Sequence, residues 1–311
     1  MIYYHIIKAI QNKYMTEIDK VNKIRAEMRS ECIDAYMIPM RNNFLDNDLK
    51  SHEMRIKYIS KFSGSAGQIF IASHKAAIFI DGRYTLQAKL EVDQKIFEIN
   101  EIGIQNYTNW IKKNLPKNCI VGYDPKLFSM TEIKNYEKKF EDHNVILKSI
   151  SSNLVDRISL KSPSQKKLII SDHKIKYSGA TRAEKLGKLR DNFIKNQEEV
   201  IFIGDCNFIS WLTNLRAYRK KYNPVIPAYC LVTMNNCHLF IESCSISKSI
   251  ATKISNDIKI HDMKDFERDI TSLVKNKITV RLDKEYTTIF VQEIFKKLNI
   301  QVSHQYDINH D

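Results

Sequence analysis

Two apolar runs separated by a short polar turn constrain the fold of this chain more than any other stretch. The runs occupy residues 68–72 and 76–80, are rich in Ile and Phe, and are joined by the polar residues 73–75. This pattern predicts a buried β-hairpin. We expect Asp81 and Gly82 to end the second strand, because Gly tolerates a positive φ and Asp can accept a hydrogen bond from its own backbone.

A Gly/Ser segment, residues 62–67, precedes the hairpin. Its GSAG sequence lacks the pattern of a phosphate-binding P-loop, and a dinucleotide-binding fingerprint would open a helix rather than a hairpin. We therefore expect Gly64 and Gly67 to permit close packing of the backbone and not to bind a nucleotide.

The positive charge of the chain raises the question of nucleic-acid binding. Its net charge is +13, and clustered Lys and Arg would release counterions from phosphates. The basic residues are instead spread along the chain and interleaved with acidic ones, as in Lys284-Glu285, and no known DNA- or RNA-binding signature is present. We do not expect a nucleic-acid partner, and a steep salt dependence of binding would be needed to support one.

Cysteine usage and hydropathy are typical of a cytoplasmic protein. The six cysteines form no CxxC pair and several lie in apolar runs, so we expect reduced core residues rather than disulfides or a zinc site. They are Cys32, Cys119, Cys206, Cys230, Cys237 and Cys244. Residues 1–14 are interpreted as an extension, with Met15 as an alternative start, because charged residues interrupt the apolar beginning and no signal-peptide cleavage site follows. No apolar run approaches the roughly 18 residues of a membrane helix, so no membrane partner is expected.

The chain carries one structural plan twice. The pattern Lys-x-x-Lys-x-Arg begins at Lys20 and again at Lys185, and apolar strands at 35–38 and 200–203 follow at the same offset of 165 positions. A second hairpin is predicted within residues 229–241. Helices alternate with these strands, which predicts α/β layering. Two copies of one α/β unit explain the pattern, and a chance similarity of basic helices and apolar strands is the alternative.

The boundaries follow from a change in composition between the copies. Residues 151–167 are polar, contain Pro163 and show no sustained periodicity. We therefore predict a first domain at 1–150, a linker at 151–167 and a second domain at 168–311. The turn of the second hairpin contains Asn235-Asn236, which favours the positive φ values of tight hairpin turns.

Two motifs at corresponding places resemble a known family. In the first copy Phe62-Ser-Gly-Ser-Ala-Gly67 is followed by Asp81-Gly-Arg-Tyr84, and in the second copy Ser210-Trp-Leu-x-Asn214-Leu-Arg216 is followed by Asn223-Pro-Val225. These segments are similar to the first two domains of the long Xaa-Pro aminopeptidases (aminopeptidase P), which belong with creatinase and prolidase to the pita-bread metallopeptidase superfamily. The resemblance implies an α/β fold of two tandem creatinase N-terminal-type domains, each a mixed β-sheet flanked by helices.

The same resemblance implies that the chemistry lies outside this chain. In the long family members a third, C-terminal pita-bread domain holds two Mn or Zn ions with two Asp, one His and two Glu, and this chain ends about where the linker to that domain begins. We therefore expect a split or truncated gene product that is inactive alone, with no catalytic residue, metal ligand or cofactor of its own. Four potential ligands lie on a polar chain end without second-shell support, which favours a solvated tail: His304, Asp307, His310 and Asp311.

Four residues are candidates for contact with a substrate or with a neighbouring domain. They are Arg83 and Tyr84 in the first copy, and Asn214 and Arg216 in the second. A cation at the end of a buried strand could meet a peptide or a carboxylate of a partner domain. For Arg83 the structural alternative is an ion pair with Asp81. The partners that the resemblance implies are a catalytic pita-bread half, if it is encoded separately, and a second copy in a homodimer.

The chain departs from the family pattern at two motifs. Lys61 stands where the family usually has Gly before the Phe of the first motif. After Asn-Leu-Arg, Ala217 and Arg219 stand where a Gly and an acidic residue are usual. The first functional hypothesis is the non-catalytic part of an Xaa-Pro aminopeptidase. The alternative is a free-standing peptide- or protein-binding module without hydrolase activity.

Overall fold

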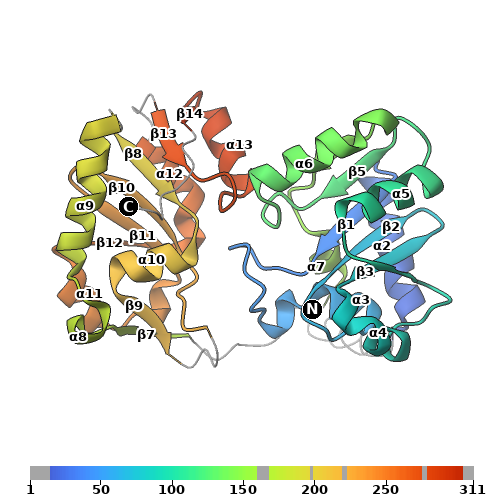
Figure 1. Ribbon diagram of the computed structural model, residues 1–311, viewed down its shortest axis with the longest axis horizontal. Coiled ribbons are helices and arrows are strands. Elements are labelled where there is room, and N and C mark those ends of the chain that lie inside the picture. Colours follow the sequence, from blue (N-terminus) through green and yellow to red (C-terminus); the bar gives the residue numbers. More distant parts are fainter. Residues whose placement is uncertain (1–14, 160–167, 197–198, 219–222, 275–278, 304–311) are drawn as a thin grey trace, which may run out of the picture. The chain divides into compact units, whose positions relative to one another are not determined.

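The chain divides into two compact units, residues 1–164 and 165–311. The computed structural model describes five stretches of it (Figure 1): residues 15–159, 168–196, 199–218, 223–274 and 279–303. The predicted extension at 1–14 and the potential ligands after residue 303 lie outside the described residues.

The first unit is built on a mixed six-stranded sheet in the order β4-β3-β2-β1-β5-β6. In it β2 pairs antiparallel with β1 and β3, whereas the pairs β3–β4, β1–β5 and β5–β6 are parallel. The strands are β1 (Ala35–Pro39), β2 (Gly67–Ala72), β3 (Ala76–Ile80), β4 (Glu98–Glu101), β5 (Ile120–Tyr123) and β6 (Ile146–Ser149). The predicted hairpin is confirmed as β2 and β3, which lie between β4 and β1 in the sheet.

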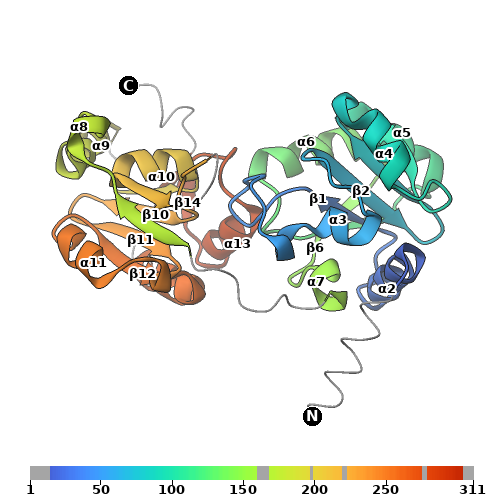
Figure 2. The ribbon, with the colours of Figure 1, turned by 90° about the horizontal axis from the view of Figure 1, so that it is seen from below.

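Helices cover both faces of this sheet (Figure 2). They are α2 (Glu17–Ser30), α3 (Arg55–Ser60), α4 (Thr85–Glu91), α5 (Ile104–Asn114), α6 (Met130–Phe140) and α7 (Leu154–Ile158). On one face Ile69 and Ile71 of β2 join an aliphatic core with Ile24 of α2 and Leu154 of α7. Successive strand residues point to opposite faces, so Phe70 lies on the other side.

Aromatic side chains make up the core on that second face. The ring centroid of Tyr107, on α5, lies 5.4 Å from Phe70 and 4.8 Å from Phe79. Trp110, one helical turn further, lies 5.9 Å from Phe70. All six residues of β2 are buried, and burial on both faces explains why this strand is a continuous apolar run and not an alternating one.

The second unit repeats this topology strand for strand. Its six-stranded sheet has the order β12-β11-β10-β8-β13-β14, with antiparallel pairs around β10 and parallel pairs elsewhere. The strands are β8 (Val200–Ile203), β10 (Tyr229–Thr233), β11 (Cys237–Ile241), β12 (Lys259–Asp262), β13 (Thr279–Leu282) and β14 (Gln301–Ser303). The prediction of two tandem α/β units with mixed sheets is confirmed.

Additional elements complete the second unit. A separate two-stranded sheet pairs β7 (Ile169–Asp172) antiparallel with β9 (Leu215–Tyr218). The helices are α8 (Ile175–Ser178), α9 (Arg182–Asn196), α10 (Cys206–Thr213), α11 (Lys248–Ile254), α12 (Phe266–Val274) and α13 (Ile289–Lys297).

The repeated basic residues make equivalent contacts in the two units. The Nζ of Lys20 donates to the carbonyl of Tyr58 at 2.8 Å and lies 4.7 Å from the centroid of that tyrosine ring. The Nζ of Lys185 donates to the carbonyl of Trp211 at 2.8 Å and lies 4.6 Å from the centroid of that tryptophan ring. In both units a lysine of the first long helix therefore donates a hydrogen bond to a carbonyl near the C-terminal end of a short helix, where intrahelical donors are lacking.

The arginine of each repeated pattern secures the hairpin. The Nε of Arg25 donates to the carbonyl of Ala72 at 3.0 Å, and the Nε of Arg190 donates to the carbonyl of Thr233 at 3.1 Å. Both carbonyls belong to the last residue of the first hairpin strand. Equivalent contacts at equivalent positions are not expected from a chance similarity, and they give the duplicated pattern a structural cause.

The structure corrects three predictions about chain geometry. The segment 151–167 is not a linker throughout, because α7 packs Leu154, Val155 and Ile158 into the core of the first unit. Gly82 does not have a positive φ; it begins a short 3-10 helix, while the Oδ1 of Asp81 accepts from the backbone of Arg83 as expected. The turn residues Asn235 and Asn236 do not have positive φ either, because the three-residue turn closes with a bond from the Thr233 N–H to the Asn236 carbonyl.

The cysteines are all free, but two of them are not core residues. Cys119, Cys206, Cys230 and Cys237 are buried, whereas Cys32 and Cys244 are exposed. Across the part of the chain that the structure describes, none of the helices has the length and apolar character needed to cross a membrane.

Lys61 marks a strained turn between α3 and the Gly/Ser segment. It follows α3 as the C-cap with φ 66°, a left-handed conformation, and its N–H donates to the carbonyl of Lys57. The left-handed conformation is energetically unfavourable for an L-residue with a Cβ, whereas Gly adopts it without this cost. The side chain partly compensates through an ion pair of its Nζ with Glu17 at 3.0 Å, but it is 65% exposed. A glycine would fit this left-handed backbone better than the lysine does.

A glycine at this position should therefore stabilise the first unit relative to an alanine. We expect Lys61→Gly to exceed Lys61→Ala by about 1 kcal/mol in free energy of unfolding, because both variants lose the ion pair and only the left-handed backbone distinguishes them. Urea unfolding followed by circular dichroism measures this difference. Equal stability of the two variants would contradict the strain at Lys61.

Candidate functional site

Arg83 and Tyr84 lie at the end of β3, in the first unit. The Nε of Arg83 donates to Oδ1 of Asp81 at 2.8 Å, and an Nη donates to Oδ2 at 3.2 Å. This contact lowers the pKa of Asp81. The structural alternative, an ion pair with Asp81, is thus present, yet the Arg83 side chain remains 74% exposed. Its guanidinium can still be reached by a carboxylate from outside the unit.

Tyr84 connects this turn to the Gly/Ser segment. Its hydroxyl lies 2.6 Å from the Oγ of Ser65, and its ring meets the edge of Phe62 with centroids 5.9 Å apart. A Cβ added at Gly64 would lie 2.4 Å from the Phe62 ring, and one at Gly67 would lie 3.2 Å from the carbonyl of Phe79. The prediction that these glycines permit close packing is confirmed.

Beside the Gly/Ser segment lies a cavity of about 210 Å³. Most of its surface is apolar, and Asn47, Asp48, Lys57, Ser63 and Ser65 contribute the polar part of its lining. The sequence pattern did not indicate this cavity, because the closure of loops within residues 40–65 forms it and no periodic pattern marks that closure.

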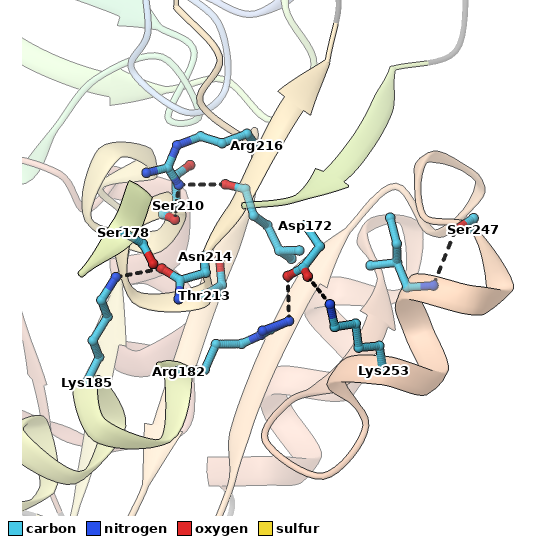
Figure 3. Close-up of polar contacts among 12 residues, drawn as sticks. Asp172, Ser178, Arg182, Lys185, Ser210, Thr213, Asn214, Arg216, Ser247 and Lys253 are labelled. Atoms are coloured by element: carbon cyan, nitrogen blue, oxygen red, sulfur yellow. Dashed lines mark hydrogen bonds and ion pairs between the residues drawn. The ribbon is translucent and has the colours of Figure 1, made fainter. Parts of the chain in front are cut away.

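In the second unit Asn214 is a buried structural residue (Figure 3). It caps α10 with φ 50°, and only 1% of it is exposed. Its Oδ1 accepts from the Nζ of Lys185 at 2.6 Å, its Nδ2 donates to the carbonyl of Ala180 at 2.9 Å, and its carbonyl accepts from the N–H of His173 at 2.7 Å. These contacts give Asn214 a structural role; contact with a substrate or a neighbouring domain stays a prediction.

Arg216 presents a cation in a different setting. It lies on β9, and its Nη1 donates to the carbonyls of Ser210 and Leu215 (Figure 3). No carboxylate among the described residues pairs with it, and partial burial lowers its pKa. Among the described residues the ammonium of Lys185 likewise donates to neutral acceptors only, and burial lowers its pKa.

One carboxylate near this region is already used. Asp172, at the end of β7, accepts from the Nη2 of Arg182 at 2.7 Å and from the Nζ of Lys253 at 2.5 Å (Figure 3). Two cations on one carboxylate join β7 to α9 and α11. The four predicted site residues lie in two places, Arg83 and Tyr84 in the first unit and Asn214 and Arg216 in the second.

A hydrogen-bonded chain of two histidines and an aspartate was not foreseen from the sequence. The Nδ1 of His238, on β11, lies 2.9 Å from the Nε2 of His261 on β12. The Nδ1 of His261 lies 3.0 Å from Asp269 on α12, which also accepts from the Nε of Arg268 at 2.8 Å. His238 and His261 are 23 residues apart and meet through the pairing of β11 with β12, whereas Asp269 follows His261 by eight residues on α12. Nothing in the local sequence pattern marks the three residues as neighbours.

The residues described here do not fit a metal site. Within the described stretches, no group of three or more His, Cys, Asp or Glu side chains is placed to hold a metal ion.

Family comparisons agree with the duplicated fold. Residues 20–158 match a family model described as the creatinase/prolidase N-terminal domain, and residues 161–308 match a second model with that description. The structure is similar to the crystal structure of X-prolyl aminopeptidase from Caenorhabditis elegans, described as a cytosolic enzyme with a di-nuclear active site, with a TM-score of 0.84 over 94% of this chain and 50% of that one. At 23% identity this likeness shows the fold.

Curated relatives extend the similarity over most of the chain. A probable Xaa-Pro aminopeptidase P from Laccaria bicolor is 31% identical over 232 residues, 73% of this chain and 36% of the relative. Xaa-Pro aminopeptidase 2 from Rattus norvegicus is 27% identical over 285 residues, 88% of this chain and 42% of the relative. The chain therefore spans less than half the length of these two relatives.

The buried His238 should make the stability of the second unit depend on pH. Burial, together with the neighbouring His261 and Lys259, lowers the pKa of His238 from 6.5 to about 4. Between these two values the unfolded chain binds a proton that the folded chain does not, so the free energy of unfolding falls as the pH is lowered through this range. Above pH 6.5 His238 is neutral in both the folded and the unfolded chain, so this loss of stability is absent there.

Urea unfolding of the wild type and of His238→Gln at pH 7 and pH 5 measures the effect. We expect the wild type to lose more stability than His238→Gln on acidification, since only the wild type carries this titrating group. His74→Gln, on an exposed turn of the first unit, should behave like the wild type. The same pH dependence in all three proteins would rule out the contribution of His238.

Proposed function

Because this chain belongs to the creatinase/prolidase N-terminal domain family, of which it contains two copies in tandem, we propose that it is the non-catalytic N-terminal part of a cytoplasmic Xaa-Pro aminopeptidase. The observation that carries the proposal is the similarity to Xaa-Pro aminopeptidases along 73% to 88% of the chain. In this proposal a pita-bread domain with two Mn or Zn ions removes the N-terminal residue before proline, from a separate chain if the gene is split.

The task of the two units is then to bind and shape the catalytic domain. Leu86 and Leu90 on α4 are 77% and 88% exposed, and at i and i+4 they lie on one face of the helix. Arg83, 74% exposed, precedes the same helix. Exposed apolar side chains beside an accessible cation are typical of a surface that a partner covers. Arg216 is the corresponding candidate in the second unit.

The same surface is compatible with the second hypothesis. A free-standing peptide- or protein-binding module would also expose Leu86 and Leu90, but it would bind its partner without hydrolysis. The two hypotheses differ in one respect: only the first requires that a catalytic partner become active toward Xaa-Pro peptides in the presence of this chain.

Cleavage of an Xaa-Pro peptide with Mn²⁺ tests the proposal. We expect no release of the N-terminal residue by this chain alone, and release when it is mixed with a pita-bread domain encoded immediately downstream, because the metal ligands reside there. Activity of this chain alone would contradict the proposal. Binding of the peptide without cleavage in the mixture would favour the binding module.

Arg83 provides a sharper test in the same mixture. We expect Arg83→Ala to weaken the association of the two parts by about tenfold, through loss of charge-assisted hydrogen bonds to the partner. Titration of the activity with increasing concentrations of this chain gives the dissociation constant. Arg268→Ala is the matched control, since Arg268 is 72% exposed and its Nε also pairs with an aspartate at 2.8 Å. Equal effects of the two substitutions would remove Arg83 from the proposed contact surface.

A further inference from the structure

The lining of the cavity in the first unit is mostly apolar, with Asp48 and Lys57 among its polar residues. Its volume is about 210 Å³, and its apolar lining consists of Met40, Leu49, Met54, Ile56 and Phe62. Phe62 and Ile56 are fully buried, whereas Met54 is 39% exposed at the edge. Such a lining favours an apolar group, because burying an unpaired charge among these apolar side chains is costly.

The first wall of the cavity is a loop that a single buried side chain organises. The Oδ1 of Asn42, a residue only 5% exposed, accepts from the N–H groups of Phe44 and Asp46 at 2.9 and 3.1 Å. The N–H of Asn42 donates in turn to the carbonyl of Asp46 at 2.9 Å. This loop carries Leu49 into the cavity, and the hydrogen bonds hold it in shape without a ligand.

The second wall, residues 63–65, is held from outside the cavity. The N–H and Oγ of Ser63 both donate to Glu91, at 2.7 and 2.6 Å. The Oγ of Ser65 lies 2.6 Å from the hydroxyl of Tyr84. Both walls are therefore built before any ligand binds, which is typical of a binding pocket.

Gly64 and Ser65, which line the cavity, each carry a backbone donor. Within the described part of the chain, the N–H groups of Gly64 and Ser65 have no hydrogen-bond partner. Gly64 packs against the Phe62 ring, where a Cβ would approach to 2.4 Å, and the residue is partly exposed. A peptide carbonyl could accept from these donors while the adjoining side chain enters the apolar interior.

We propose that this cavity binds one bulky apolar side chain, of the size of Leu, Met or Phe, from an uncharged stretch of a peptide. The backbone carbonyl of that peptide accepts from the N–H of Gly64 or Ser65. The site lies entirely in the first unit and involves no hydrolysis, so it stands or falls independently of the proposed aminopeptidase role.

Methyl NMR on the intact chain tests the proposal directly. Met40 and Met54 line the cavity, so with ¹³C-methyl methionine labelling their signals report on occupancy. We expect N-acetyl-leucine methylamide to shift both signals and to bind about tenfold or more tightly than N-acetyl-glycine methylamide, which cannot fill the interior. Met234, 40% exposed in the second unit, serves as the internal control and should not shift.

Two matched substitutions locate the binding site. Met54 is 39% exposed, and we expect the larger side chain in Met54→Trp to block the cavity and weaken binding of the leucine compound about tenfold. The methyl signal of Met40 reports this binding. Met234→Trp, at a position 40% exposed, should leave binding unchanged. Circular dichroism checks that both variants are folded, and the comparison of ligand sizes on the wild-type chain does not depend on either variant.

Three outcomes would overturn the proposal. They are equal binding of the leucine and glycine compounds, equal effects of the two tryptophan substitutions, and no shift of Met40 or Met54 at the solubility limit of the leucine compound. Self-association lost in Met54→Trp, as measured by sedimentation velocity, would identify a second copy of this chain as the occupant in place of a peptide.

Discussion

The pairing of a fully buried hairpin with a fully buried central strand is the constraint on which each unit depends. In the first unit β1 pairs with β2 over five residues, from Ala35 opposite Ala72 to Pro39 opposite Gln68, and neither strand has an exposed residue. Both faces of these strands must be covered, so helices are required on both sides of the sheet. The aliphatic core on one face and the aromatic core on the other follow from this requirement.

Basic side chains attach the first long helix of each unit to this hairpin. Arg25 and Arg190 donate to the carbonyl that ends a hairpin strand, and Lys20 and Lys185 serve a carbonyl near a helix end. Some of the basic side chains of the chain therefore donate hydrogen bonds to backbone carbonyls inside each unit. This use explains why a basic pattern recurs in a protein without a nucleic-acid-binding signature.

The two units have diverged where a short helix turns into the next segment. Both need a left-handed residue there, and the chain supplies Lys61 in one and Asn214 in the other. Asn214 tolerates the left-handed conformation, and its side chain also accepts a hydrogen bond from Lys185. Lys61 adopts the same conformation with its side chain largely in solvent. The second unit consequently has a buried polar centre at this point. The first unit has instead an accessible segment beside a cavity, and for this reason the candidate contacts with other molecules are concentrated there.

The sequence by itself determined the hairpins, the duplicated α/β plan, the role of the two motif glycines and the resemblance of the motifs, because continuous apolar runs and repeated spacing are local signals. It did not indicate the edge strands β4 and β12, since their residues are largely polar and partly exposed, or the membership of α7 in the first core. Only the tertiary structure decided that Arg83 is accessible while Asn214 is buried, that His238, His261 and Asp269 form one chain, and that two loops within residues 40–65 enclose a cavity. Each of these depends on strand register, burial or loop closure in three dimensions, which no local pattern encodes.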